Sequence, residues 1–286
     1  MTQTDMLKLG IRGFIIDIDG VLYIDKNVVP GAIRTIQYLQ KNKIPFLLAT
    51  NTTRKSRYSL QSNLNNFGFK VELDQIFSTT FAAKEWLTRH KAKSIYLYLR
   101  GDGYREFKDF KVTANKPEYI VIGDMGEDLT YDKLNHAFQL VMGGTKIIAL
   151  QKNRYWRKSG SLVIDAGAIV AALEYATMKR ATVIGKPSKT FFSHAITKLN
   201  LKPTEVAVIG DDLESDINGG KRSGLFTISV QTGKYNEEEY KKSKIKPDVL
   251  LPSIAVLPKW VENNLHIKKK TTPRNSQQVL DIRTIR

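Results

Sequence analysis

In the stretch GFIIDIDGVLY, residues 13–23, two carboxylates stand at the end of an apolar run. Its first residues are aromatic and β-branched, which favours a buried β-strand that ends at Asp17. Asp19 follows two positions later, and Gly20 comes next. The function of this acidic pair depends on which other residues the fold brings to the same place, so the rest of the chain has to be considered with it.

Short apolar runs of this kind alternate along the chain with longer segments that have apolar residues at helical spacing. Alternation of strands and helices is typical of an α/β fold in which helices cover a parallel sheet, here a doubly wound, Rossmann-like sheet. Helices are expected at GAIRTIQYLQKN (31–42), SRYSLQSNLNNFG (56–68) and KTFFSHAITKLNL (189–201). The expected strands are residues 13–19, 44–50, 94–99, 118–123, 146–150, 181–185, 205–211 and 225–230.

The length and composition describe a folded protein of ordinary type. With 286 residues, of which 42% are hydrophobic and 26% charged, the chain can bury a full core and divides most naturally into two domains. We find no apolar run of about 18 residues and no apolar stretch of signal-peptide length at the N-terminus. The sequence therefore predicts a cytoplasmic protein without a membrane partner.

The residue types present restrict the chemistry. The chain has no cysteine, which excludes thiolate catalysis and cysteine zinc sites, and its four histidines are scattered along the sequence. Any metal site must therefore use mainly oxygen ligands. The net charge of +17 suits an anionic partner, such as nucleic acid, a membrane surface or a phosphorylated small molecule, but does not choose among them.

Polar residues stand at the ends of four predicted strands. In a doubly wound fold the carboxyl ends of the strands line the crevice in which ligands bind, so residues far apart in sequence should meet there. The side chains at these ends are carboxylates, one hydroxyl with a neighbouring amide, and one lysine. They are Asp17 and Asp19, Thr50 and Asn51, Lys186, and the acidic group Asp211, Asp212 and Asp216.

These groups together indicate a magnesium and phosphate site. Crowded carboxylates repel one another unless a cation lies between them, and oxygen ligands are those that Mg²⁺ prefers. We expect Asp17 and Asp211 to be the side-chain ligands, and Lys186 and Thr50 to bind a phosphate. Gly20 lets the backbone approach the anion closely, because glycine has no Cβ.

A phosphate held in this way allows a two-step transfer. One carboxylate can attack phosphorus and form an aspartyl phosphate, while a second protonates the leaving oxygen and then activates water. The sequence therefore predicts Asp17 as the nucleophile and Asp19 as the general acid and base. Lys186 and the cation would neutralise charge on the transferring group.

Four segments in this order, DIDGVLY, LLATNTT, GKPS and GDDLESD, resemble the haloacid dehalogenase superfamily of phosphatases. The additional segments VPGA and TGKY are similar to its subclass IIA, which has a C2-type cap, and to the branch of phospholysine phosphohistidine inorganic pyrophosphate phosphatase. The resemblance implies a core domain formed by residues 1–80 and 179–265 and an inserted α/β cap domain at 81–178. It also implies a small phosphorylated substrate and favours a homodimer, since caps of this type often pair.

The resemblance also assigns roles residue by residue. It implies that the backbone carbonyl of Asp19 joins Asp17 and Asp211 at the metal, and that Lys186 steadies the phosphoaspartate. Gly20, Thr50 and Asn51 would bind phosphate together with Lys186. Asp212 and Asp216 would be outer-shell or alternative metal ligands, although helix capping explains an Asp after a strand equally well. The animal members of this branch have serine in place of Asp19, so their substrates are not transferred to this chain.

Within the cap, QKNRYWRKSG (151–160) combines basic and aromatic residues. A solvated loop with one buried aromatic is one interpretation of this segment, and contact with the substrate is the other. The candidates for substrate contact are Asp124, Arg154, Tyr155, Trp156 and Arg157.

The favoured function is a Mg²⁺-dependent phosphatase for a small phosphorylated metabolite, either a phosphate monoester or pyrophosphate. The alternative is a protein of the same fold that mainly binds an anionic partner such as nucleic acid. Residues 266–286 form a basic tail that is predicted to be disordered, and this tail is the main feature that supports the alternative. Because no nucleic-acid-binding motif accompanies the positive charge, the sequence disfavours a nucleic-acid partner.

Overall fold

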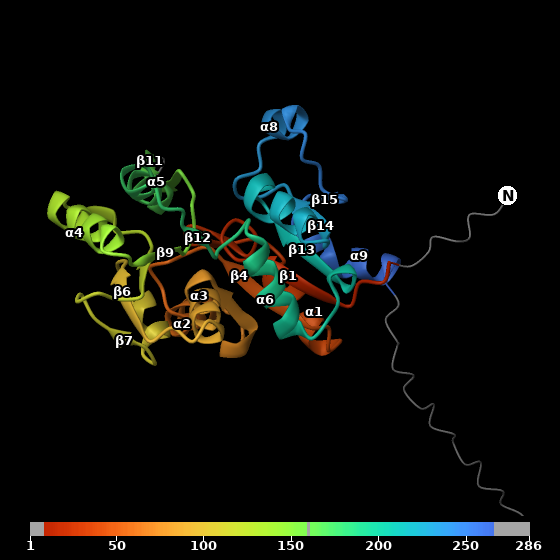
Figure 1. Cartoon of the computed structure of the whole chain (residues 1–286). Coiled ribbons are helices and arrows are strands. Elements are labelled where there is room, and N and C mark those ends of the chain that lie inside the picture. Colours follow the sequence, from red (N-terminus) through yellow and green to blue (C-terminus); the bar gives the residue numbers. More distant parts are fainter. Residues whose placement is uncertain (1–8, 159–160, 266–286) are drawn as a thin grey trace, which may run out of the picture.

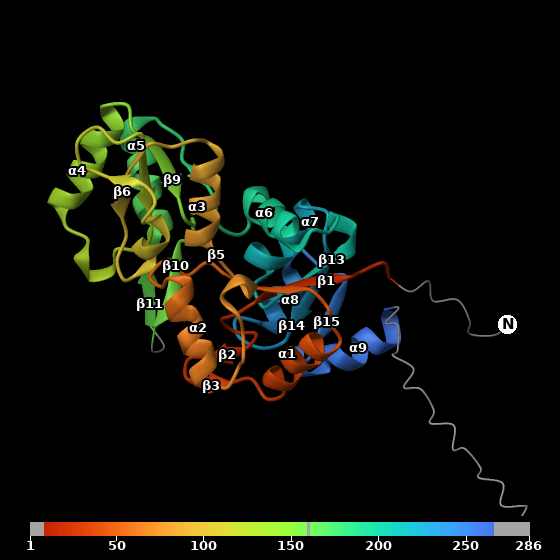
Figure 2. The same cartoon turned by 90° about the horizontal axis from the view of Figure 1, so that it is seen from below.

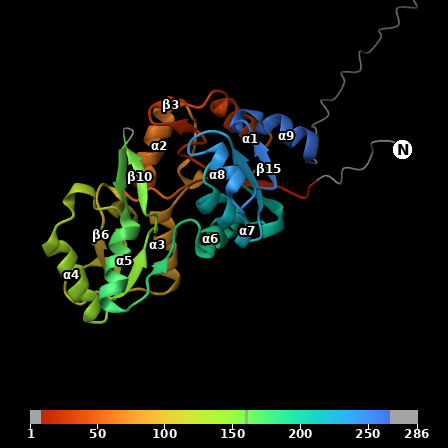
Figure 3. The same cartoon turned by 90° about the horizontal axis from the view of Figure 1, so that it is seen from above.

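The computed structural model describes residues 9–158 and 161–265. Two parallel β-sheets form the framework, and they lie beside each other with helices packed around both (Figure 1). Turning the molecule shows the same arrangement from below and from above (Figures 2 and 3). The expectation of an α/β fold with parallel sheets is confirmed.

The first sheet has six strands in the order β15-β14-β13-β1-β4-β5, all parallel. Strand β1 (Gly13–Asp17) lies in its interior between β4 and β13, and all five of its residues are buried. Because strands are added on both sides of β1, the sheet is doubly wound. The other strands are β4 (Phe46–Thr50), β5 (Ile76–Ser78), β13 (Val206–Gly210), β14 (Phe226–Val230) and β15 (Val249–Leu251).

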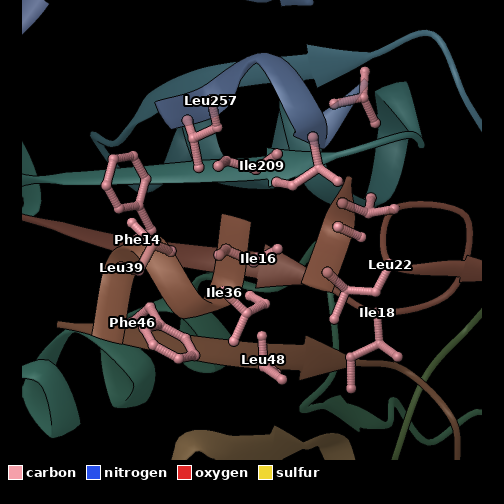
Figure 4. Close-up of a cluster of buried hydrophobic side chains, with 14 of the residues drawn as sticks. Phe14, Ile16, Ile18, Leu22, Ile36, Leu39, Phe46, Leu48, Ile209 and Leu257 are labelled. Atoms are coloured by element: carbon pink, nitrogen blue, oxygen red, sulfur yellow. The ribbon is translucent and has the colours of Figure 1, made fainter. Parts of the chain in front are cut away.

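Helices cover both faces of this sheet, as the alternation of side chains along β1 requires. Phe14 and Ile16 point to one face, where they pack with Ile36 and Leu257 (Figure 4). Ile15 points to the other face and belongs to a different hydrophobic cluster. The first face is covered by α1 (Ala32–Lys41) and α9 (Leu257–Asn264), and the second by α3 (Thr79–Arg89) and α6 (Lys189–Leu199).

The second sheet is formed by strands in the order β12-β9-β8-β6-β7, again all parallel. Helices α4 (Tyr131–Met142) and α5 (Ala166–Thr177) pack against one face of it. Side chains on its other face join the cluster that contains Ile15 and the residues of α3, so one hydrophobic core is shared by the two sheets. The strands are β6 (Ser94–Tyr98), β7 (Lys111–Val112), β8 (Tyr119–Ile122), β9 (Lys146–Ala149) and β12 (Thr182–Val183).

The remaining elements are short or lie at the margins of the sheets. Two antiparallel hairpins occur, one from β2 (Tyr23–Ile24) and β3 (Asn27–Val28), the other from β10 (Tyr155–Lys158) and β11 (Ser161–Ile164). A π-helical turn at Leu213–Asn218 follows β13. The other helices are α2 (Arg57–Asn66), α7 (Gly219–Arg222) and α8 (Glu237–Lys242).

All eight expected strands and all three expected helices are present. The first sheet is assembled from residues on both sides of the segment that forms most of the second sheet, as an inserted cap requires. Strand β12 belongs to the second sheet although it lies after position 178. The domain boundaries at residues 80 and 178 stay a prediction, and the tail at 266–286 lies outside the described residues.

No helix among the described residues combines the length and the apolar character needed to cross a membrane.

Candidate active site

The ends of three strand segments meet at Lys186, which lies just after β12. Its Nζ is 2.6 Å from Asp17 Oδ1, at the end of β1, and 2.6 Å from Asp216 Oδ1, in the turn after β13. All three side chains are buried. Although burial alone would lower the pKa of Lys186, the two carboxylates raise it above its usual range, so the ammonium group stays charged.

Three carboxylates form a compact cluster around this lysine. One oxygen each from Asp17, Asp211 and Asp216 lies within 4.8 Å of the others, and all three residues are buried. Burial and repulsion by neighbouring carboxylates raise the pKa of each of the three acids, that of Asp211 to about 7. Because one lysine cannot compensate three buried acids, the cluster fits a small divalent cation that takes oxygen ligands.

Asp211 is held by two glycines and a backbone N–H. Gly20 has φ +88° and Gly233 has φ +63°, and a Cβ on either residue would overlap with Asp211 Oδ2. The backbone N–H of Lys234 donates to the same oxygen over 2.7 Å. Close contact with this carboxylate therefore requires glycine at position 20, and the predicted approach of its backbone to a phosphate stays a prediction.

Asn51 fixes the backbone of Lys186. Its Nδ2 donates to the carbonyl oxygen of Lys186, and its Oδ1 accepts from the N–H of Lys186, both over 2.8 Å. This reciprocal pair joins the end of β4 to the segment that carries the lysine. In the structure, then, Asn51 contacts Lys186, and its predicted contact with phosphate stays a prediction.

The buried residue Thr50 contacts Asp19. Thr50 Oγ1 is 3.3 Å from Asp19 Oδ2, and it accepts a hydrogen bond from the N–H of Thr52. Unlike Asp17, Asp19 is solvent-exposed, and its carboxylate is outside the compact cluster. A carboxyl group in contact with water can exchange protons with a leaving group or a water molecule.

Asp212 has a different environment from its neighbour Asp211. Its Oδ1 accepts from the N–H groups of Glu214 and Ser215, which caps the turn after β13. Its Oδ2 lies 2.8 Å from Lys234 Nζ. Although burial alone would raise it, the pKa of Asp212 is lowered by Lys234 and by these hydrogen bonds. The capping interpretation of Asp212 describes these contacts, whereas Asp216 belongs to the carboxylate cluster.

Residues of the inserted segment contact the loop that follows Thr50. Arg54 Nε is 2.7 Å from Asp124 Oδ2, and the Arg54 guanidinium lies 5.5 Å from the ring centre of Trp156. Asp124 and Trp156 are therefore near this loop. Arg154 and Tyr155 are exposed and contact each other, and the side chain of Arg157 lies outside the described residues.

A second set of contacts connects the inserted segment to the first turn of α2. Asp102 accepts hydrogen bonds from the Ser56 N–H at 2.9 Å and from the hydroxyls of Ser56 and Ser59 at 2.6 Å. Glu106 accepts from the N–H of Arg57 over 2.8 Å. Several residues of the inserted segment therefore bind the chain at residues 54–59, just beyond Thr50.

Sequence reasoning missed Lys234, Asp102 and Glu106. Lys234 lies in the segment TGKY, which carried only part of the family resemblance and was given no role. Asp102 and Glu106 bond to residues more than 40 positions away, and no local pattern in the sequence marks such contacts.

A doubly wound sheet with buried acids and a lysine at the ends of its strands is the framework of a hydrolase that works with carboxylates. Residues 14–113 match the model of the haloacid dehalogenase-like hydrolase family, and residues 183–257 match a second model of HAD-hydrolase-like proteins. Human haloacid dehalogenase-like hydrolase domain-containing protein 2 is 35% identical over 238 residues, which is 83% of this chain and 90% of that protein. The chain belongs to the haloacid dehalogenase-like hydrolase family, as its motifs predicted.

Further relatives and solved structures agree with this assignment. Human phospholysine phosphohistidine inorganic pyrophosphate phosphatase is 31% identical over 252 residues, 86% of this chain and 92% of that protein. The p-nitrophenyl phosphatase from Archaeoglobus fulgidus has a TM-score of 0.83 and 25% identity, over 87% of this chain and 99% of that one. NagD from E. coli K-12 has a TM-score of 0.79 and 26% identity, over 86% of this chain and 97% of that one.

Proposed function

We propose that the protein is a Mg²⁺-dependent phosphatase that hydrolyses a small phosphorylated metabolite through an aspartyl-phosphate intermediate. The observation that carries the proposal is the contact of Lys186 with both Asp17 and Asp216, next to Asp211. The predicted nucleophile Asp17, the ammonium group of Lys186 and a set of carboxylate oxygens that can bind a metal then lie next to one another.

In the first half-reaction, an oxygen of Asp17 attacks phosphorus and the bond from phosphorus to the leaving oxygen breaks. Asp19 gives its proton to that oxygen, so the leaving group departs as an alcohol or, from pyrophosphate, as phosphate. Lys186 orients Asp17 and carries positive charge next to the transferring group. The hydroxyl of Thr50, which faces Asp19, would donate to a phosphate oxygen.

In the second half-reaction, Asp19 takes a proton from water as the water oxygen attacks the phosphoaspartate. The bond between Asp17 and phosphorus breaks, which restores the carboxylate and releases inorganic phosphate. Asp17, Asp211 and the backbone carbonyl of Asp19 would hold a Mg²⁺ ion, and Asp216, which lies in the same carboxylate cluster, would be an outer-shell or alternative ligand. When bound, the ion would supply charge neutralisation for the phosphoryl group.

The named relatives support phosphate esters or pyrophosphate as substrates. One relative is named as a phosphatase of phospholysine, phosphohistidine and inorganic pyrophosphate, and a structural neighbour is named as a p-nitrophenyl phosphatase. We infer that this chain is a phosphoric monoester hydrolase of the same type. The alternative function, binding of an anionic partner, is supported mainly by the overall charge and by the composition of the tail. No contact among the described residues favours it.

The test is release of phosphate from p-nitrophenyl phosphate by the purified protein, measured with and without Mg²⁺. We expect hydrolysis that requires the ion and returns when Mg²⁺ is added back after chelation. Hydrolysis of equal rate in the presence of a chelator would refute the metal dependence. A panel of pyrophosphate, sugar phosphates, phosphoglycolate and pyridoxal phosphate would then find the natural substrate class.

Two further expectations belong to this proposal. We place the enzyme in the cytoplasm, where a chain without cysteine needs no disulfide. We also propose a homodimer, which the exposed apolar side chains of Tyr155, Leu162 and Ile164 on the β10–β11 hairpin favour. Light scattering of the purified protein tests the second expectation, and a monomer at all concentrations would refute it.

A further inference from the structure

A second lysine, Lys234, contacts the acidic cluster from the solvent side. It follows β14 in the loop at residues 231–235, and 62% of its side chain is exposed. Its Nζ is 2.8 Å from Asp212 Oδ2, and its backbone N–H donates to Asp211 Oδ2 over 2.7 Å. Lys186, by contrast, is buried and pairs with Asp17 and Asp216, so the two lysines contact different acids.

The loop that carries Lys234 is fixed to the end of β1. Thr232 Oγ1 donates to the carbonyl oxygen of Gly20 over 2.6 Å. Gly233 packs so closely on Gly20 that a Cβ at position 233 would lie 2.6 Å from Gly20 Cα. The position of the ammonium group at the rim of the cluster is therefore determined by backbone packing as well as by its ion pair.

The charge of Lys234 reaches several acids. It lowers the pKa of Asp212, and it opposes the rise in pKa that burial causes at Asp211 and Asp216. The same charge also acts on Asp165, the residue that caps α5 on the second sheet. Lys234 thus contributes a positive potential at these carboxylates.

We propose that Lys234 has opposite effects on the two ligands of the site: its charge weakens binding of the divalent cation and strengthens binding of the phosphorylated substrate. A fixed positive charge repels a cation held by Asp211 and attracts the dianionic phosphate that must approach the same acids. The inference rests on the proposed function, because it needs a site that binds both a metal and a phosphate.

The size of the effect follows from the position of the charge. Removing one charge that contacts the acids of the site should change each affinity by about tenfold at low salt, in opposite directions. Because the ammonium group is exposed to solvent, the effect should shrink as the ionic strength rises. If Lys234 only held the loop in place, its replacement would instead weaken the binding of both the cation and the phosphate.

The experiment compares the wild type with Lys234→Gln and Lys234→Arg. Calorimetric titration with MgCl₂ in the absence of substrate gives the metal affinity. Equilibrium dialysis with inorganic phosphate at saturating Mg²⁺ gives the phosphate affinity. Lys242→Gln is the matched control, because it removes the same charge from an exposed position on α8. Either change at position 234 keeps the N–H that bonds to Asp211, and a thermal melt checks that the variants are folded.

We expect Lys234→Gln to bind Mg²⁺ about tenfold more tightly and phosphate about tenfold more weakly, with Lys234→Arg and Lys242→Gln close to the wild type. Equal affinities in Lys234→Gln and the wild type, or a loss of both affinities, would overturn the inference. A Lys234→Arg variant that behaves like Lys234→Gln would also overturn it, because charge would then not be the cause. Failure of the wild type itself to bind Mg²⁺ would refute the proposed function instead.

Discussion

The side chains of Lys186 and Asp17 meet at 2.6 Å although 169 positions separate them in the sequence. The contact joins the loop after β12, which returns from the second sheet, to the end of the strand on which the first sheet is centred. Both residues are buried, so each depends on the other for charge compensation. Asp17, which precedes the inserted segment, and Lys186, which follows it, thus belong to one site.

Replacement of Lys186 by methionine should destabilise the metal-free protein. The change leaves Asp17 and Asp216 buried without their cation, which costs about 3–5 kcal/mol when one partner of a buried pair is removed. Addition of Mg²⁺ should stabilise this variant more than the wild type, because the cluster of the variant lacks the positive charge of Lys186. Urea unfolding with and without Mg²⁺ measures both effects. Equal stabilisation by Mg²⁺ in the two proteins would contradict the expected coupling.

Asn51→Ala should lower activity through the position of Lys186. The variant loses both hydrogen bonds to the Lys186 backbone, at a cost of about 1–3 kcal/mol in stability. We expect kcat to fall more than KM rises, since Thr50, the predicted phosphate ligand, is retained. Asn65→Ala on α2 is the control, because Asn65 contacts Val71 and not the site. Unchanged kcat in Asn51→Ala would show that this backbone clamp does not position the lysine.

Asp19→Asn should slow catalysis without affecting stability. Asp19 is exposed, so its replacement should leave the melting temperature unchanged, while loss of the acid and base should lower kcat by about 10²–10⁴-fold. If breakdown of the intermediate is the step more affected, a phosphoryl group should accumulate on the variant. Intact mass after an acid quench detects it. Wild-type kcat in this variant would exclude Asp19 as the acid and base.

The stability of the contact between the second sheet and α2 should depend on pH through Asp102. Burial alone would raise its pKa, but hydrogen bonds from Ser56 and Ser59 lower it. A lowered pKa stabilises the fold above the pKa of the unfolded chain, about 3.9, and this contribution is lost as the pH falls through the folded-state pKa. Asp102→Asn should therefore be less stable than the wild type by about 1–2 kcal/mol at pH 7.

The same difference should begin to shrink below about pH 4, where the carboxyl of the unfolded chain takes up its proton, and should shrink further as the pH falls through the lowered folded-state pKa. Urea unfolding of both proteins between pH 3 and 7 provides the comparison. A difference that stays constant over this range would mean that the charge of Asp102 does not contribute to the contact.

The strands and the main acids of the site could be read from the sequence because the signals are local. Strands β1, β4 and β13 are apolar runs that each end at or directly before a polar residue, and in a parallel sheet such ends must lie at one edge. The contact of Lys186 with Asp17 is then a consequence of topology. The roles assigned to the individual residues remain predictions until the variants are measured.

Other parts of the structure have no local signal. Residues 151–160 combine basic and aromatic residues, and charged residues interrupt the alternation that marks a strand, so the sequence does not predict the β10–β11 hairpin. Lys234 follows a glycine in a loop without periodicity, and its relation to Asp211 and Asp212 appears only when β13 and β14 pair. Asp102 acts on α2 across the boundary of two sheets, which no pattern within either segment reveals.

The central claim is that Asp17 is the residue that forms the covalent intermediate, and Asp17→Asn tests it most directly. Asparagine has nearly the same shape and keeps an acceptor for Lys186, so a thermal melt should show a folded protein. The measurement is Mg²⁺-dependent phosphate release from p-nitrophenyl phosphate by the variant and the wild type. We predict that the variant loses at least about a thousandfold in kcat and never carries a phosphoryl group. Phosphate release by Asp17→Asn at a rate near that of the wild type would contradict the mechanism.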